Sequence, residues 1–260
     1  MPAPNLTRVA TYRRRVAASA ERVWENVHDW EHLPWLHASS FRSIALEDVG
    51  DWGWRARIGL HPSAEIGLEL VLSPDAPRYV SRTTAGPGAG SEIWTTVTAI
   101  SDAATDVAVE FWLPDVATAH ADAIGAAYVQ LYTRLWDEDE AMMVRRAEEI
   151  ARPHGAATPR QRRRLGSIDA IRARAPFCFE WAGARWRLVE IDGALHAHAA
   201  TCPHWLGPLD DAPLADGAIT CPWHGWRFDV RSGRALDGRR GRLPAAPFVE
   251  IDAEGGVSVG

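Results

Sequence analysis

Two short segments near the C-terminal end of the chain each pair a cysteine with a histidine. The first pair is Cys202 and His204, and the second is Cys221 and His224. Thiolates and imidazoles at such short spacing are typical metal ligands, so the two loops are expected to lie side by side around one metal centre. The remaining cysteine, Cys178, lies in an apolar run and is predicted to be a buried core thiol. An odd, small number of cysteines does not indicate a disulfide framework.

The residues around these pairs resemble the cluster loops of Rieske proteins. Residues 221–229, CPWHGWRFD, are very similar to the second cluster loop of the oxygenase group, and residues 206–209, LGPL, resemble the end of the first. The resemblance implies a [2Fe–2S] cluster with Cys202 and Cys221 on one iron and His204 and His224 on the other. Respiratory Rieske proteins add a second cysteine pair that this chain lacks, so the likeness is to the ferredoxin or oxygenase kind.

A structural zinc site of the Cys2His2 type is the competing interpretation of the same four residues. Zinc fingers place their histidines on a helix, and no helical pattern follows Cys221. The two loops also lack the residues typical of zinc fingers. A brown protein would exclude zinc, and a colourless zinc protein would support it.

The N-terminal part of the chain combines many strand-like segments with two helical ones. Ser19 is the predicted N-cap of a helix over residues 20–30, and helical periodicity extends over residues 116–150. Segments rich in β-branched and aromatic residues predict strands at 7–17, 41–48, 52–60, 65–73, 79–84, 92–100 and 105–113. This order, and the segment Ala17–Trp24, resemble the helix-grip fold of the START/polyketide-cyclase (SRPBCC) superfamily. In that fold a curved antiparallel sheet wraps around a long C-terminal helix and encloses an apolar cavity.

The composition divides the chain into two domains of an α+β protein. Residues 1–150 are the predicted helix-grip domain, and residues 151–165, with Pro153, Gly155 and Pro159, are the predicted linker. Residues 166–260, with short strands and many glycines, are the predicted mostly-β Rieske domain, including an Asp-Gly hairpin at 191–195. The linker arginines favour a solvated connector, with docking of an acidic electron-transfer partner as the alternative.

A second metal site is indicated at the end of the first helix, in the pattern Glu25-x3-Asp29-x2-His32-x4-His37. This pattern resembles the mononuclear-iron motif of Rieske non-haem iron oxygenases. The resemblance implies that His32 and His37 bind Fe(II) and that Asp29 bridges to a cluster histidine of a neighbouring subunit. The family places a carboxylate ligand on the last long helix, where Asp139 lies on the apolar stripe and would complete a 2-His-1-carboxylate set. The acidic residues at 137, 138 and 140 lie off that stripe and are predicted to be solvated.

The resemblance implies an oxidoreductase that uses O2 and electrons from a reductase or ferredoxin. Hydroxylation or dealkylation of a small apolar or aromatic substrate is the expected reaction, and a homotrimer the expected assembly. Oxygenases of this family carry the Rieske domain first, whereas here the order is reversed, which leaves the substrate undefined. The alternatives are a non-catalytic electron carrier or redox sensor with a ligand-binding helix-grip domain, and a cofactor-free lipid pocket.

Composition narrows the possible partners and the location. The net charge of −6 disfavours a general nucleic-acid binder. The longest apolar stretches are too short to span a bilayer, and the first residues lack the apolar core of a signal peptide, so a cytoplasmic protein is expected. Four of the 13 tryptophans, Trp52, Trp54, Trp94 and Trp112, lie on predicted strands and indicate a tryptophan-rich cavity.

Overall fold

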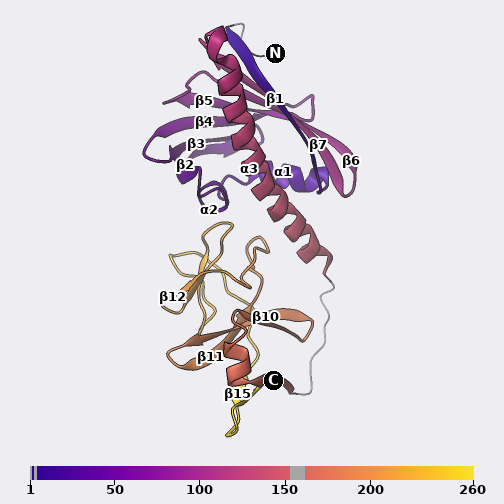
Figure 1. Cartoon of the computed structure of the whole chain (residues 1–260), viewed down its shortest axis with the longest axis vertical. Coiled ribbons are helices and arrows are strands. Elements are labelled where there is room, and N and C mark those ends of the chain that lie inside the picture. Colours follow the sequence, from indigo (N-terminus) through magenta and orange to yellow (C-terminus); the bar gives the residue numbers. More distant parts are fainter. Residues whose placement is uncertain (1, 3–4, 153–161) are drawn as a thin grey trace. The chain divides into compact units, whose positions relative to one another are not determined.

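The computed structural model describes residue 2, residues 5–152 and residues 162–260 (Figure 1). The chain divides into two compact units, residues 1–147 and residues 148–260. Most of the predicted linker, residues 153–161, lies outside the described residues. Regular structure begins again at Arg163, slightly before the predicted start of the second domain. Within the described part of the chain, no helix combines the length and the apolar character needed to cross a bilayer.

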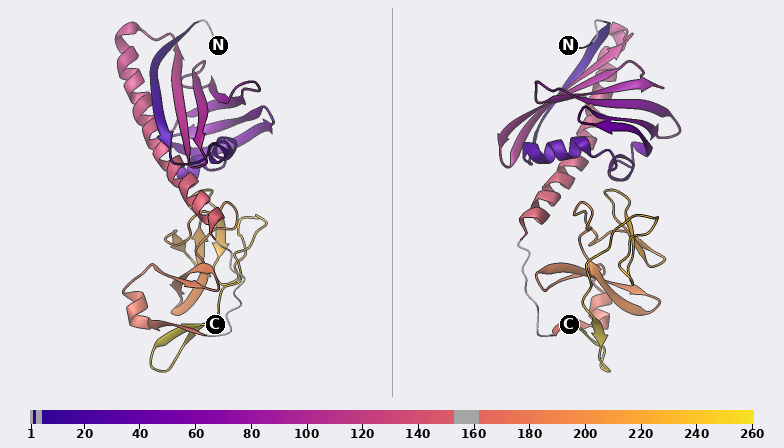
Figure 2. Two further views of the ribbon diagram at one scale, coloured as in Figure 1. Left: turned by 90° about the vertical axis from the view of Figure 1, so that its right-hand side faces the viewer. Right: turned by 180° about the vertical axis from the view of Figure 1, so that it is seen from behind.

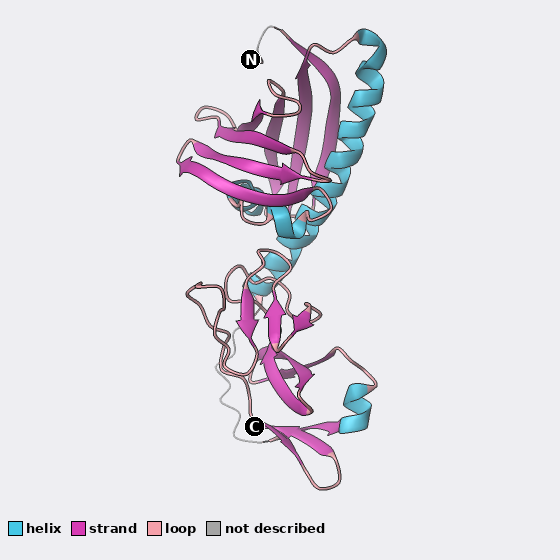
Figure 3. Ribbon diagram, turned by 90° about the vertical axis from the view of Figure 1, so that its left-hand side faces the viewer, coloured by secondary structure: helices cyan, strands magenta, loops and turns pink. Residues whose placement is uncertain are grey.

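The first unit is a seven-stranded antiparallel sheet with three helices, and its strand order is β1-β7-β6-β5-β4-β3-β2. The strands are β1 (Leu6–Val16), β2 (Phe41–Gly50), β3 (Gly53–Leu60), β4 (Glu65–Leu72), β5 (Arg78–Ala85), β6 (Glu92–Ser101) and β7 (Ala104–Pro114). The helices are α1 (Ala20–His28), α2 (Leu33–Leu36) and α3 (Thr118–Ala151). Figures 2 and 3 show the curved sheet with α3 lying along one face. The predicted helix-grip fold is confirmed.

Local sequence signals explain these elements. Ser19 caps α1 as predicted, because its hydroxyl accepts a hydrogen bond from the Arg22 backbone N–H at 3.3 Å. Every second residue of β7 from Thr105 to Phe111 is buried, which is the alternation that a strand with one face on the core must show. Helix α2 was not predicted, and it proves important for the site.

The long helix is fixed to the sheet by an aromatic cluster. Phe111 on β7 is fully buried, and its ring lies 4.8 Å from that of Tyr132 and 5.1 Å from that of Tyr128, both on α3. Aromatic rings at this separation contribute both buried area and favourable edge contacts. Phe111 therefore holds the helix in the position from which its side chains reach the cavity.

Replacing Phe111 by alanine should cost about 3–5 kcal/mol in the free energy of unfolding, because it leaves a cavity in the core. Urea unfolding of the purified protein measures this loss. The matched change Ile100→Ala, at a side chain that is 49% exposed, should alter stability by less than about 0.5 kcal/mol. Equal losses in the two variants would contradict this account of how α3 is held.

The second unit consists of three small three-stranded sheets, one short helix and long loops. Its strands are β8 (Arg163–Ser167), β9 (Phe177–Trp181), β10 (Ala184–Ile191), β11 (Ala194–Ala199), β12 (Leu214–Ala215), β13 (Ala218–Thr220), β14 (Arg227–Asp229), β15 (Val249–Ile251) and β16 (Gly256–Val259), and its helix is α4 (Ile168–Arg172). The predicted hairpin joins β10 to β11, and both of its central residues, Asp192 and Gly193, have positive φ.

Candidate functional site

The two histidines of the first unit flank the short helix α2. His32 is its N-cap and His37 its C-cap, and the Leu36 N–H donates to the His32 carbonyl at 2.8 Å. Pro34, which stands in the first turn where its missing N–H costs nothing, is the sequence signal that could have revealed this helix. One helical turn thus separates the histidines, and both side chains are buried.

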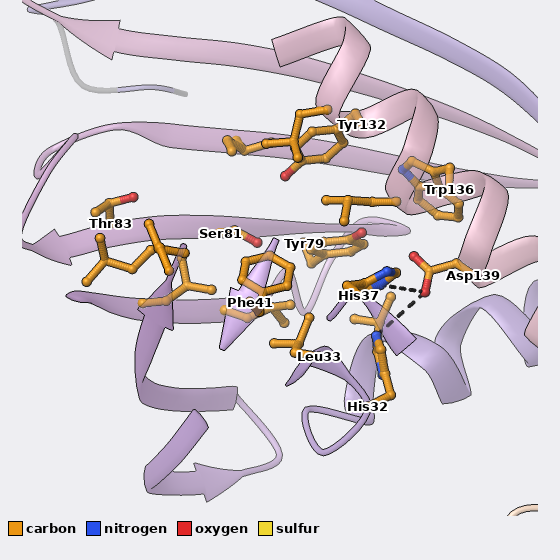
Figure 4. Close-up of a pocket in the computed structure, with 18 of the residues that line it drawn as sticks. His32, Leu33, His37, Phe41, Tyr79, Ser81, Thr83, Tyr132, Trp136 and Asp139 are labelled. Carbon is orange, nitrogen blue, oxygen red and sulfur yellow. Dashed lines mark ion pairs between the residues drawn. The ribbon is translucent and has the colours of Figure 1, made fainter. Parts of the chain in front are cut away.

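The imidazoles of both histidines converge on one carboxylate from α3 (Figure 4). Asp139 Oδ1 lies 3.1 Å from His37 Nε2 and 3.6 Å from His32 Nε2. One ligand atom from each of the three residues lies within 4.8 Å of the others. Two imidazoles and one carboxylate that face one another are the donor set that suits ferrous iron.

A second layer of polar groups orients these three residues. Glu138 Oε2 lies 2.6 Å from His37 Nδ1, Asp29 Oδ2 lies 3.4 Å from His32 Nδ1, and Asn26 Nδ2 donates to Asp139 Oδ1 at 3.0 Å. A carboxylate at Nδ1 keeps the proton there and turns the Nε2 lone pair toward a metal. His37 shows this arrangement, whereas His32 Nδ1 makes no hydrogen bond within the described residues and only lies near Asp29. In both histidines the Nε2 atom faces Asp139.

The prediction that the acidic neighbours of Asp139 are solvated is wrong for two of them. Glu138 contacts His37, because its long side chain reaches around the helix from the neighbouring position. Glu140 binds Arg14 and accepts a hydrogen bond from the Ala17 N–H at 2.7 Å. Helical periodicity predicts the side of the helix on which a residue's Cα lies. It does not predict which groups the long, flexible side chain of a glutamate can reach.

The electrostatics of the cluster favour a bound cation. Burial raises the pKa of Asp139, but the hydrogen bond and charge of His37 and the charge of His32 lower it more, and the pKa lies below its ordinary value. Burial lowers the pKa of His37, yet Asp139 and Glu138 raise it above its usual range. A buried carboxylate needs positive charge beside it, and a divalent cation among the three ligand atoms would supply that charge. The residues present therefore fit a metal.

The three residues lie at one end of a cavity of about 280 Å³. Its wall is mainly aliphatic and aromatic, and it includes Leu33, Phe41, Trp54, Ile66, Leu68 and Trp136. The predicted tryptophan-rich lining is wrong, since of the four strand tryptophans only Trp54 contributes. Trp112 follows buried Phe111 and so faces the opposite side of the sheet, where Arg8 lies over its ring.

The two loops of the second unit share one backbone geometry around their cysteines. The N–H groups of Leu206 and Gly225, each four positions after a cysteine, donate to the Cys202 and Cys221 carbonyls at 3.0 Å. Each cysteine N–H donates to the carbonyl five positions on, at 2.8 Å in both loops. Leu206 and Gly225 have nearly equal positive φ values of 62° and 63°. Such matched tight turns present two similar pairs of side chains to one point.

The sulfur atoms of the two loops are buried and in contact. Cys202 and Cys221 are 0% and 1% exposed, and a hydrogen bond between their thiols lowers the pKa of Cys221 and raises that of Cys202. Two backbone N–H groups of its own loop also point at each sulfur. Thiolates require such donors when they are removed from water. The pair therefore fits a site that holds an iron between two sulfur ligands.

The imidazoles of the two loops lie beside each other. The rings of His204 and His224 have centroids 4.8 Å apart, and the Trp226 ring stacks on His204 at 4.4 Å and 17°. A zinc finger would place these histidines on a helix, and the structure has turns at both positions. Two adjacent thiols with two adjacent imidazoles fit the asymmetric ligand set of a Rieske cluster.

Gly207 leaves the space that the sulfur atoms need. A Cβ at this position would lie 2.7 Å from Cys221 Sγ and 3.1 Å from the Trp223 ring. Gly207→Ala should therefore push the two loops apart and reduce the cluster content by more than about half, read from visible absorption and sulfide analysis. Gly193→Ala, the same exchange in a hairpin where no atom lies within 4 Å, strains only its own positive-φ turn and should keep the cluster. Unchanged cluster content in Gly207→Ala would contradict this role.

The other candidate residues have ordinary roles. Cys178 is only half-buried and its Sγ lies 3.5 Å from the Asp210 carbonyl, so the prediction of a core thiol is wrong. The strand β9 that carries it buries the neighbouring Phe179 instead. His198 is fully buried on β11, where burial lowers its pKa to about 4, and His28 at the end of α1 is exposed.

Comparison with protein families gives an independent assignment for the second unit. Residues 162–246 match the Rieske [2Fe–2S] domain. The chain is 41% identical over 50 residues to apoptosis-inducing factor 3 of Mus musculus, or 19% of this chain and 8% of that protein. It is 39% identical over 54 residues to the ferredoxin component of the naphthalene 1,2-dioxygenase system of Pseudomonas aeruginosa, or 21% of this chain and 52% of that protein. The chain thus spans about half of this ferredoxin and a small part of the factor.

Solved structures similar to the first unit have low sequence identity. A START superfamily protein from Mycobacterium smegmatis is 15% identical, covers 55% of this chain and 98% of its own, and has a TM-score of 0.44. The ZhuI aromatase/cyclase from Streptomyces sp. R1128 is 13% identical, covers 56% and 98%, and has a TM-score of 0.46. The strand order and the long helix described above carry the fold assignment. The chain therefore joins an N-terminal START-like helix-grip domain to a Rieske [2Fe–2S] domain at residues 162–246.

Proposed function

We propose that this chain is a cytoplasmic Rieske oxygenase component that hydroxylates or dealkylates a small apolar substrate with O2. In this proposal His32, His37 and Asp139 hold a mononuclear Fe(II), and Cys202, His204, Cys221 and His224 hold the cluster. The observation that carries it is the convergence of three ligand atoms within 4.8 Å at the end of an apolar cavity. A pocket built only to hold a lipid gains nothing from burying two histidines and an aspartate.

The protein residues would provide orientation and a dry site. Bound iron would supply O2 activation, and the cluster would supply single electrons from a reductase or ferredoxin. Glu138 holds the proton on His37 Nδ1, so that its Nε2 atom stays available as a ligand, and the Asp29 carboxylate lies 3.4 Å from His32 Nδ1. The apolar wall excludes water and orients the substrate beside the ligand residues. We assign to Asp29 the bridge to a cluster histidine of a neighbouring subunit in a homotrimer.

Nitric oxide tests this proposal, because it binds as an O2 surrogate to mononuclear ferrous iron with an open position and gives there a high-spin signal that a [2Fe–2S] cluster does not give. Anaerobically reduced, iron-replete protein should give the EPR signal of a high-spin iron nitrosyl in addition to the cluster signal. His32→Ala should lose the nitrosyl signal and keep the cluster signal. The control His28→Ala, at an exposed histidine of α1, should keep both. An iron-replete protein without the nitrosyl signal would contradict the proposal.

A second candidate function is that of a non-catalytic electron carrier or redox sensor whose first domain binds a ligand. It is favoured by the relatives named as ferredoxin components, which match about a fifth of this chain. This function requires the cluster alone and predicts that ligand binding is indifferent to His32 and His37. The nitric oxide experiment separates the two, since the carrier has no mononuclear iron.

A further inference from the structure

The cavity size limits what the first domain can take. An engineered protein cavity of about 150 Å³ binds benzene, so 280 Å³ accommodates a molecule about twice that size. A fused two-ring skeleton fits this volume. The aliphatic and aromatic wall accounts for the apolar part of such a molecule.

Two hydroxyl groups line the cavity on the far side of Tyr79 from the metal ligands. Tyr132 lies seven residues before Asp139 on α3, about 10 Å along the helix axis. Ser81 lies on β5, and both side chains line the cavity. Figure 4 shows their hydroxyls directed inward, on the far side of Tyr79 from Asp139. Among the described residues, neither hydroxyl has a hydrogen-bond partner.

These hydroxyls are available to a ligand. Burial raises the pKa of Tyr132 well above its ordinary value, so its hydroxyl stays protonated and can donate. A hydroxyl left without a partner in an apolar site costs free energy, and a ligand oxygen would recover that cost. Thr83, farther along β5, is in a different position, because its hydroxyl already accepts from Ser91 at 3.0 Å.

The charge of the cavity excludes anions. The ionisable side chains among its described lining residues are Asp29, His32, His37, Asp139 and the tyrosines, and neither lysine nor arginine is among them. Beside Tyr132 and Ser81, a carboxylate or sulfonate would lose its hydration without a lysine or arginine to receive it.

We infer that the substrate is a neutral two-ring molecule with one hydroxyl or carbonyl group, bound by Tyr132 and Ser81 on the far side of Tyr79 from the metal ligands. This inference rests on the proposed function, because only an enzyme has a substrate. The binding of the molecule can be measured without turnover. The two hydroxyls would recognise the polar group of the ligand. The ligand's opposite end would lie beside the metal ligands and react.

Matched probes test the inference by calorimetry on anaerobic, metal-loaded, full-length protein. We expect 2-naphthol to bind about tenfold more tightly than naphthalene, which lacks the hydroxyl, and 2-naphthoate to bind more weakly than either. Tyr132→Phe combined with Ser81→Ala should abolish the preference for 2-naphthol and leave naphthalene unchanged. Ser43→Ala, at an exposed serine outside the cavity, should keep the preference.

The possible outcomes separate this inference from the proposed function. Equal or tighter binding of 2-naphthoate, no binding of 2-naphthol, or a preference that survives the double variant would each overturn the inference, whatever the iron content. A preference for 2-naphthol that holds in protein with only the cluster iron would support it while removing the oxygenase proposal.

Discussion

The variant Asp139→Ala should bind Fe(II) in the first domain more than about 100-fold more weakly than the unchanged protein and lose all turnover. Asp139 Oδ1 is the atom that both Nε2 atoms face, at 3.1 Å and 3.6 Å. Its removal leaves two neutral imidazoles, which hold ferrous iron poorly without a negative partner. Iron analysis and the cluster spectrum measure the effect, and the cluster spectrum should not change.

Asp137→Ala is the matched control, two residues away on the same helix. Asp137 is largely exposed, and its carboxylate pairs with Arg14 rather than with the histidines. This variant should keep its iron and its turnover. If Asp139→Ala kept the mononuclear iron, or if both variants lost it equally, the assignment of Asp139 as a ligand would fail.

A second large effect is expected at the other centre, where Cys221→Ala should produce a colourless protein without a cluster EPR signal. Cys221 is 1% exposed and its thiol contacts that of Cys202, so no other group can take its place. The loss should be nearly complete, because one iron would keep a single thiolate. Visible absorption and acid-labile sulfide are the measurements.

Cys178→Ala provides the control for this change. Cys178 lies on β9 with its sulfur against the Asp210 carbonyl, just after the first loop, and it is not one of the two cysteines whose thiols meet. The variant should stay brown and keep its sulfide content. Retention of a full cluster in Cys221→Ala would show that the ligand assignment is wrong.

The sequence predicted most of the first domain because its strands bury only one face. Alternating burial, as in β7, leaves a period-two pattern, and the long stripe on α3 leaves a helical one. Two local features were also predicted correctly. Ser19 caps α1 through its hydroxyl, and Asp192-Gly193 forms a tight hairpin that needs positive φ. These features depend on neighbours in the sequence.

The features that were missed depend on contacts between distant residues. Helix α2 has four residues, too few for any periodic signal. The contact of Glu138 with His37 joins two elements 101 positions apart. The half-exposure of Cys178 and the position of Trp112 depend on which face of a sheet is covered. Residue patterns indicated Asp29, His32, His37 and Asp139 as a group, but only the fold shows that their side chains meet.

Iron and sulfide analysis of anaerobically purified protein tests the central claim most directly. The account predicts about three irons and about two acid-labile sulfides per chain, that is, one Rieske cluster and one mononuclear iron. About two irons with two sulfides, in a sample supplied with excess Fe(II), would contradict it and leave an electron carrier joined to a ligand-binding domain.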